Sequence, residues 1–203
     1  QHALGVEWTL SQDAFRVVPG RTSHPFTLRG VLAVVGGLYD PLGFVAPVAL
    51  AGRLLQRQAF TRMAGDRRWD ADLPPDLFPQ WDEWVEGPSE LRLLSWPRFI
   101  GGASGPRHRE LHFFADASEN AVGIVVYSRI FDVQGEPKVS FVSASSKLAP
   151  RRPVTMPRLE LCAAVEAARA AREMAEELDG FFSNLFFYSD SEIVRGYLFN
   201  SER

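Results

Sequence analysis

The fold is decided by residues 111–128, which read LHFFADASENAVGIVVYS. Residues 111–117 and 121–128 are apolar runs rich in aromatic and β-branched side chains, and a short polar turn separates them. A third predicted strand, residues 138–145, mixes apolar and polar side chains and follows a turn at residues 132–137. Strands joined by short polar turns predict an antiparallel meander of three strands.

Downstream of the meander, residues 157–178 have the pattern of one long helix. Pro157 suits a first helical turn, Thr155 is a capping candidate beside it, and Gly180 follows the last turn as a stop signal.

Residues 185–188, LFFY, are a continuous apolar run, and residues 193–199 begin another helix. A strand reached through a helical crossover is expected to be central, buried and parallel to the first strand. The predicted fold class is therefore α+β, with a mixed sheet of three antiparallel strands, a helix crossover and a parallel strand.

The first hundred residues predict a mainly helical segment. Residues 4–18 alternate as two short antiparallel strands would, and we expect their partner strands to precede Gln1. Helical spacing follows at residues 31–38 and 45–64 with a Pro/Gly elbow between them, and a short helix is expected at residues 75–86. The tryptophans in this half are more often core anchors than a binding platform.

A linker is predicted at residues 101–107. The run GGASGP at residues 101–106 contains small and turn-forming residues and nothing that could pack into a core. The domain boundary is therefore expected there.

Composition narrows the class of protein. The chain has 203 residues, 46% of them hydrophobic, which is enough for one large core or two small ones. No apolar stretch is long enough to cross a bilayer, no signal peptide begins the sequence, and a net charge of -3 argues against a generally basic surface.

The single cysteine, Cys162, cannot form an internal disulfide and is expected to fill the helix core, so we expect an intracellular setting. The first residue is Gln1 rather than Met, and the last helical pattern breaks off near Phe199. We therefore expect a fragment of a longer protein.

Three acids fall at distinctive points of the predicted elements. Asp116 lies near the end of the first strand, Glu160 in the first turn of the long helix, and Asp190 at the end of the last strand. In open α/β sheets, ligands gather beyond the carboxyl ends of the strands, where Asp116 and Asp190 both fall if their strands are parallel neighbours. Glu160 must then face the sheet for the three acids to converge.

Convergent carboxylates repel one another unless a hard divalent cation neutralises them, and oxygen ligands favour Mg²⁺ or Mn²⁺ over zinc. Two such ions about 4 Å apart can activate water and stabilise the leaving oxygen in phosphodiester cleavage. Taken singly, an Asp at a strand end is usually a cap or turn residue, and a Glu in a first turn usually complements the helix dipole. The order of all three acids on these elements favours the metal site.

The stretch from Lys147 to Arg158 is basic. It contains Lys147, Arg151, Arg152 and Arg158, has no acid, and lies immediately before Glu160. Such a loop can contact substrate phosphates beside the site. It can equally be a solvated loop, and the sequence does not decide between the two.

Five short motifs stand out along the chain: TLRGVL (residues 27–32), YDPLGF (39–44), FADAS (114–118), MPRLELC (156–162) and YSDS (188–191). Together they resemble the Pol polyprotein of BEL/Pao-type LTR retrotransposons, and the resemblance covers nearly the whole chain. It implies that residues 1–100 are the end of a reverse transcriptase palm, the thumb and the connection. Residues 108–203 would be a ribonuclease H-like domain, C-terminally incomplete.

The resemblance also implies a reaction, a cofactor and partners. The reaction would be hydrolysis of the RNA strand of RNA/DNA hybrids, with Asp116, Glu160 and Asp190 as both catalytic and metal-binding residues. The cofactor would be Mg²⁺ or Mn²⁺, as two ions in the complete enzyme. The partners would be the RNA/DNA hybrid and the upstream polymerase and downstream Pol domains, without a membrane, in the cytoplasm (in a virus-like particle) or the nucleus.

Two rival functions stay open. The family segment has also been catalogued as a Pao-type peptidase, but an aspartic peptidase needs an Asp-Thr/Ser-Gly loop, and neither Asp116 nor Asp190 is followed by that glycine. Ribonuclease H normally adds a fourth acidic or histidine ligand from a later helix, which this sequence does not reach. The parent is expected to be a ribonuclease H/reverse transcriptase, whereas this fragment can be inactive because that ligand is missing. A domesticated, non-catalytic nucleic-acid-binding or structural module is the other rival.

Overall fold

The computed structural model describes residues 2–3, 5–20, 23–65, 68–100, 108–178 and 180–200. It divides the chain into two compact units, Gln1–Phe99 and Ile100–Arg203, and each unit is described below by itself. The expected linker, residues 101–107, lies outside the described residues. Within the described ranges, no helix combines the length and apolar character that crossing a membrane requires.

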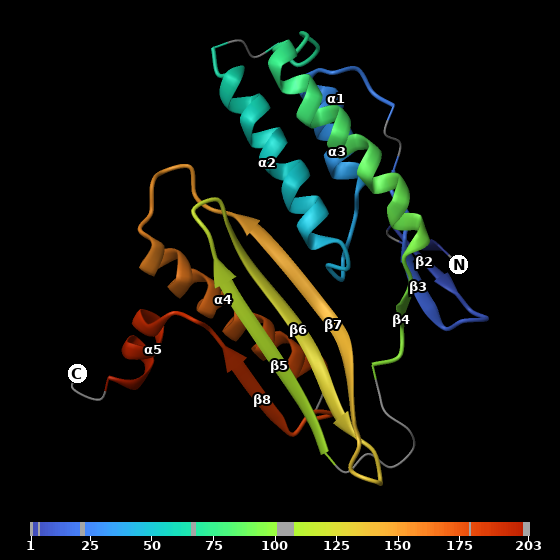
Figure 1. Ribbon diagram of the computed structural model, residues 1–203, viewed down its shortest axis with the longest axis vertical. Helices are drawn as coiled ribbons and strands as arrows, with labels where there is room; N and C mark the ends of the chain where they lie inside the picture. Colours follow the sequence, from blue (N-terminus) through green and yellow to red (C-terminus); the bar gives the residue numbers. More distant parts are fainter. Residues whose placement is uncertain are drawn as a thin grey trace. The chain divides into compact units, whose positions relative to one another are not determined.

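Unit 1 combines three helices with a small sheet (Figure 1). The helices are α1 (Leu28–Gly37), α2 (Ala46–Arg62) and α3 (Phe78–Glu90), with 3₁₀ turns η1 (Pro75–Leu77) and η2 (Leu91–Leu93). The strands are β1 (His2–Ala3), β2 (Val6–Thr9), β3 (Ala14–Val17) and β4 (Trp96–Pro97), in the order β1-β2-β3-β4.

The expectation that the partner strands of the β2–β3 hairpin precede Gln1 was wrong. β2 pairs with β1, and β3 pairs with β4, where Phe15 lies opposite Trp96. The pairing of β3 with β4 joins segments that are far apart in the sequence, so local alternation could not reveal it.

The core of unit 1 is formed by the apolar faces of its helices. The predicted face of α1 is confirmed, since Val31, Val34 and Val35 are buried. Trp81 and Trp84 are core anchors as expected, whereas Trp69 remains 42% exposed. The full set of buried residues is Val17, Leu28, Val31, Val34, Val35, Leu38, Val45, Ala59, Leu73, Trp81, Trp84 and Leu91.

The first two family-like motifs hold helix ends. Thr27 is the N-cap of α1, and its hydroxyl accepts the N–H of Gly30 at 3.1 Å. The Asp40 carboxylate accepts the N–H groups of Phe44 at 2.9 Å and Val45 at 2.7 Å, which fixes the elbow before α2. Gly43 has a φ of +75°, a conformation that favours glycine.

Unit 2 has the predicted mixed sheet. Its strands are β5 (His108–Ala117), β6 (Ala121–Phe131), β7 (Pro137–Leu148) and β8 (Asn184–Tyr188), in the order β7-β6-β5-β8. The meander β5-β6-β7 is antiparallel, and β8 is parallel to β5. Helix α4 (Met156–Glu177) makes the crossover, and α5 (Glu192–Phe199) follows β8.

Helix α4 covers one face of this sheet (Figure 1). Its alanines Ala163, Ala167 and Ala171 are buried, and they share one core cluster with Leu111 and Phe113 of β5. Small side chains allow a helix to approach a sheet closely. The alternate residues of β5 point to the opposite face.

Three expectations about unit 2 were wrong in detail. β8 is an edge strand rather than a buried central one, and its residues, such as Phe187 at 53%, are exposed. The reason is that α4 packs over β5 and β6 and leaves β8 uncovered among the described residues. Glu160 lies one residue beyond the first turn, because α4 begins at Met156. Cys162 is exposed rather than part of the core.

Candidate carboxylate site

The register of β5 and β8 brings Asp116 and Asp190 to the same end of the sheet. Phe114 is paired with Tyr188 in parallel, and Asp116 and Asp190 each follow two residues later. Asp116 is the second-last residue of β5, while Asp190 lies beyond β8, between the strand and α5. Both residues are exposed at the carboxyl ends of adjacent parallel strands, which is where ligands bind in such sheets.

Glu160 reaches the same end of the sheet from α4. Its carboxylate oxygen Oε2 accepts the hydroxyl proton of Ser191, the residue after Asp190. Glu160 is half-buried, between the buried Leu159 and the exposed Leu161. The three acids therefore come from three elements with neighbouring ends, and their convergence on one ion stays a prediction.

The three carboxylates do not share one coordination sphere in this geometry. Among the described residues, no three histidine, cysteine, aspartate or glutamate side chains are close enough to hold a metal ion together. The Asp116 carboxylate accepts the N–H of Ala117 at 2.7 Å, and that of Glu160 is turned toward Ser191. The donor set, carboxylate oxygens only, is the kind that Mg²⁺ or Mn²⁺ prefers.

The basic loop begins beside this end of the sheet. The N–H of Ala149 donates to the carbonyl of Asn120 at 2.8 Å, which ties the loop to the turn that follows Asp116. Arg151, Arg152 and Arg158 are exposed, and within the described ranges none of the three has an ion-pair partner. Their side chains are available to an anionic ligand.

Lys147 differs from the three arginines. It lies in β7, not in a loop, and its ammonium group donates to Glu166 of α4. That hydrogen bond lowers the pKa of the Glu166 carboxyl, against the opposing effect of burial, and Arg169 also contributes at 3.0 Å. Lys147 thus already has a partner in the fold.

The sequence reasoning missed a buried polar cluster on the face of the sheet that α4 does not cover. Glu110 is only 7% exposed, and its carboxylate lies 2.9 Å from His108 Nε2, 3.0 Å from His112 Nε2 and 3.5 Å from Arg129. His112 Nδ1 in turn lies 2.9 Å from the Tyr188 hydroxyl of β8. The signal was present in the sequence, because residues 108, 110 and 112 alternate as polar residues in a strand.

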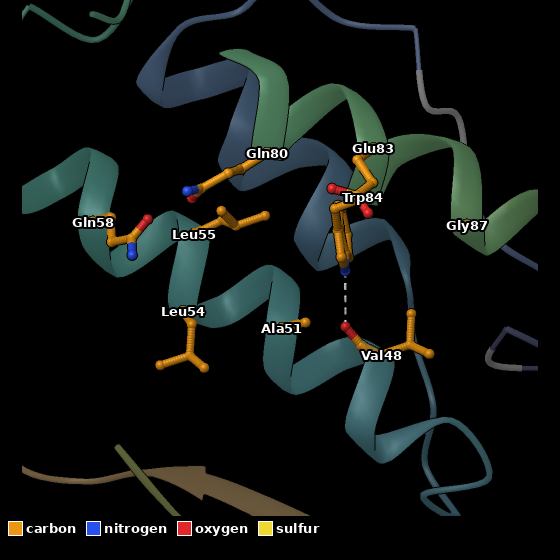
Figure 2. Close-up of a pocket in the computed structure, with 9 residues that line it drawn as sticks. All are labelled: Val48, Ala51, Leu54, Leu55, Gln58, Gln80, Glu83, Trp84 and Gly87. Atoms are coloured by element: carbon orange, nitrogen blue, oxygen red, sulfur yellow. Dashed lines mark hydrogen bonds between the residues drawn. The ribbon is translucent and has the colours of Figure 1, made fainter. Parts of the chain in front are cut away.

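Unit 1 has a pocket on elements that carry none of these acids. The pocket is a groove of about 470 Å³ between α2 and α3 (Figure 2). At one end of it, the Trp84 indole N–H donates to the Val48 carbonyl at 2.9 Å. It is lined by Val48, Ala51, Leu54, Leu55, Gln58, Gln80, Glu83, Trp84 and Gly87. None of the predicted site residues lines it.

An antiparallel meander, a helical crossover and a strand parallel to the first form a ribonuclease H-like fold. The chain matches the family model described as the Pao retrotransposon-like RNaseH-like domain over residues 27–191. It therefore belongs to this family, which confirms the resemblance to BEL/Pao elements. The search of curated proteins gave no match.

Proposed function

We propose that this chain is the nuclease part of a retrotransposon Pol polyprotein that hydrolyses the RNA strand of RNA/DNA hybrids. The observation that carries the proposal is the β5–β8 register, with Asp116 and Asp190 at one end of adjacent parallel strands. Glu160 is hydrogen-bonded to Ser191, the residue after Asp190. The family description supports the same class of protein.

Asp116, Glu160 and Asp190 would hold Mg²⁺ or Mn²⁺ at this end of the sheet. When bound, two such ions activate a water for attack on the phosphodiester and stabilise the leaving oxygen. The chain's own contribution is to keep the three carboxylates on rigid elements and to present them to the substrate.

Arg151, Arg152 and Arg158 would hold the phosphate backbone of the hybrid. Contacts to phosphates position a nucleic acid without reading its sequence, which suits an enzyme that must act along a whole hybrid. Their exposure and lack of ion-pair partners among the described residues support this role. The upstream polymerase and downstream Pol domains are the proposed protein partners.

The test is a cleavage assay on a labelled RNA/DNA hybrid with a longer Pol polypeptide that contains these 203 residues. We expect cleavage of the RNA strand that depends on Mg²⁺ or Mn²⁺ and is lost in Asp116→Asn. Glu119→Gln is the matched control, because it removes one negative charge from the adjacent exposed turn and should leave cleavage unchanged.

Other outcomes would contradict the proposal. Equal cleavage by the wild type and Asp116→Asn would exclude the carboxylate site as its source. Hybrid binding without turnover would identify a non-catalytic module. Proteolysis at acid pH without metal would favour the peptidase.

A further inference from the structure

We infer that Ser191 is a positioning residue that holds Glu160 in orientation for cation binding. The inference rests on the proposed function and deepens it, because it adds a residue that orients one of the proposed metal ligands. Ser191 is 6% exposed and makes two side-chain hydrogen bonds of opposite direction.

The direction of each hydrogen bond is fixed by the groups involved. Ser191 is the N-cap of α5, and its hydroxyl oxygen accepts the N–H of Val194 at 3.2 Å. An N–H group can only donate, so the single hydroxyl proton is free to point at Glu160 Oε2. The Oε1 atom of Glu160 then has no partner in the described part of the chain and is left for a cation.

The position of Ser191 couples two of the proposed ligands. It follows Asp190 directly, and its carbonyl accepts the N–H of Arg195 at 3.0 Å, which begins α5. Val194 of the same helix turn is fully buried. Ser191 therefore links the start of α5 to α4 across 31 residues and fixes Glu160 beside Asp190. Outer hydrogen bonds of this kind orient metal ligands, and their loss costs about 10–100-fold in metal affinity.

Substitutions can separate this role from helix capping. Ser191→Ala and Ser191→Gly both remove the hydroxyl, but glycine is tolerated as an N-cap much better than alanine. A positioning role predicts that both weaken Mn²⁺ binding by about 10-fold or more, although only alanine lowers the melting temperature clearly. Ser191→Thr keeps the hydroxyl and should restore binding. Thr27→Ala is the control, because it removes a capping hydroxyl from α1 and none of the proposed ligands, and should leave Mn²⁺ binding unchanged.

The measurement is calorimetric titration of Mn²⁺ into the 203-residue chain, with thermal melts of each variant. Wild-type binding that is unchanged in both Ser191→Ala and Ser191→Gly would overturn this inference and leave the proposed function standing. Binding that falls only in proportion to the melting temperature would show a capping role alone. Absence of Mn²⁺ binding in the wild type would overturn both the inference and the proposed cation site.

Discussion

At the scale of single residues, Gly52 shows how closely α2 approaches α3. A Cβ atom at Gly52 would lie 2.3 Å from Cζ2 of Trp84, closer than carbon atoms pack. Trp84 cannot move away easily, because it is buried and its indole N–H is bonded to Val48. Glycine is therefore required here by packing, not by backbone conformation.

Gly52→Ala should destabilise unit 1 by about 1–3 kcal/mol, the usual cost of overpacking a core. All five tryptophans lie in unit 1, so urea unfolding followed by tryptophan fluorescence reports on this unit. Gly36→Ala in α1 is the control, since a Cβ there meets nothing within 4 Å and should be neutral or stabilising by about 0.5–1 kcal/mol. Equal stability of the two variants would contradict the packing described.

Glu110 carries a second residue-scale prediction. Burial raises the pKa of Glu110. The hydrogen bonds from His112 and His108, together with the charge of Arg129, lower it by more than burial raises it, so the pKa lies below its ordinary value of 4.5. A carboxyl with a lowered pKa in the folded state stabilises the fold above its unfolded pKa. That contribution is lost as the pH falls through the folded pKa.

Glu110→Gln should therefore lower the free energy of unfolding of unit 2 by about 1.5–3 kcal/mol at neutral pH, the usual value for hydrogen bonds to a charged group. The gap between wild type and variant should narrow as the pH falls below about 4.5. Amide hydrogen exchange of β5 and β8, measured at several pH values, checks both points. A gap that widens below that pH would show that the cluster does not stabilise the ionised carboxylate.

At the scale of elements, the basic loop before α4 predicts a measurable salt dependence of hybrid binding. Each phosphate that a protein neutralises adds about one unit to the slope of log affinity against log salt. Replacing Arg151, Arg152 and Arg158 together by alanine should reduce this slope by about one unit for every arginine that binds a phosphate. Arg172→Ala is the control, since Arg172 lies on the exposed side of α4 near Glu176. An unchanged slope would show that the three arginines do not contact phosphates and that the loop is only solvated.

The elements also show what the sequence could and could not predict. The strands and helix of unit 2 were found because each apolar run is bounded by polar turns, Pro157 or Gly180. The exposure of β8 could not be predicted, because an apolar run indicates a preference for burial but does not show which helix or strand packs against it. β4 was missed because two residues paired with distant β3 carry no local pattern.

For the candidate site, the sequence predicted which elements carry the three acids, but not the directions of their side chains. Ser191 could have been identified as an N-cap from its place before a helix. Its hydrogen bond to Glu160 depends on the tertiary contact between α4 and α5, which no spacing reveals. The same holds for Lys147, whose partner Glu166 lies on a separate element.

At the scale of the whole chain, a family match over residues 27–191 spans both compact units. The motifs of unit 1 hold helix ends, as at Thr27 and Asp40, whereas those of unit 2 include Asp116, Glu160 and Asp190. The shared motifs therefore serve stability in one unit and, on our proposal, chemistry in the other.

The most direct test of the carboxylate site is Mn²⁺ titration by calorimetry on the whole chain and on the Asp116→Asn/Asp190→Asn double variant. The matched control is Glu173→Gln/Glu177→Gln, which also removes two negative charges. These two residues lie about 20–25 Å from Glu160 along α4. We predict that wild type and control bind Mn²⁺ and that the double variant does not. Equal binding by all three proteins, or no binding by the wild type, would contradict a metal site formed by Asp116, Glu160 and Asp190.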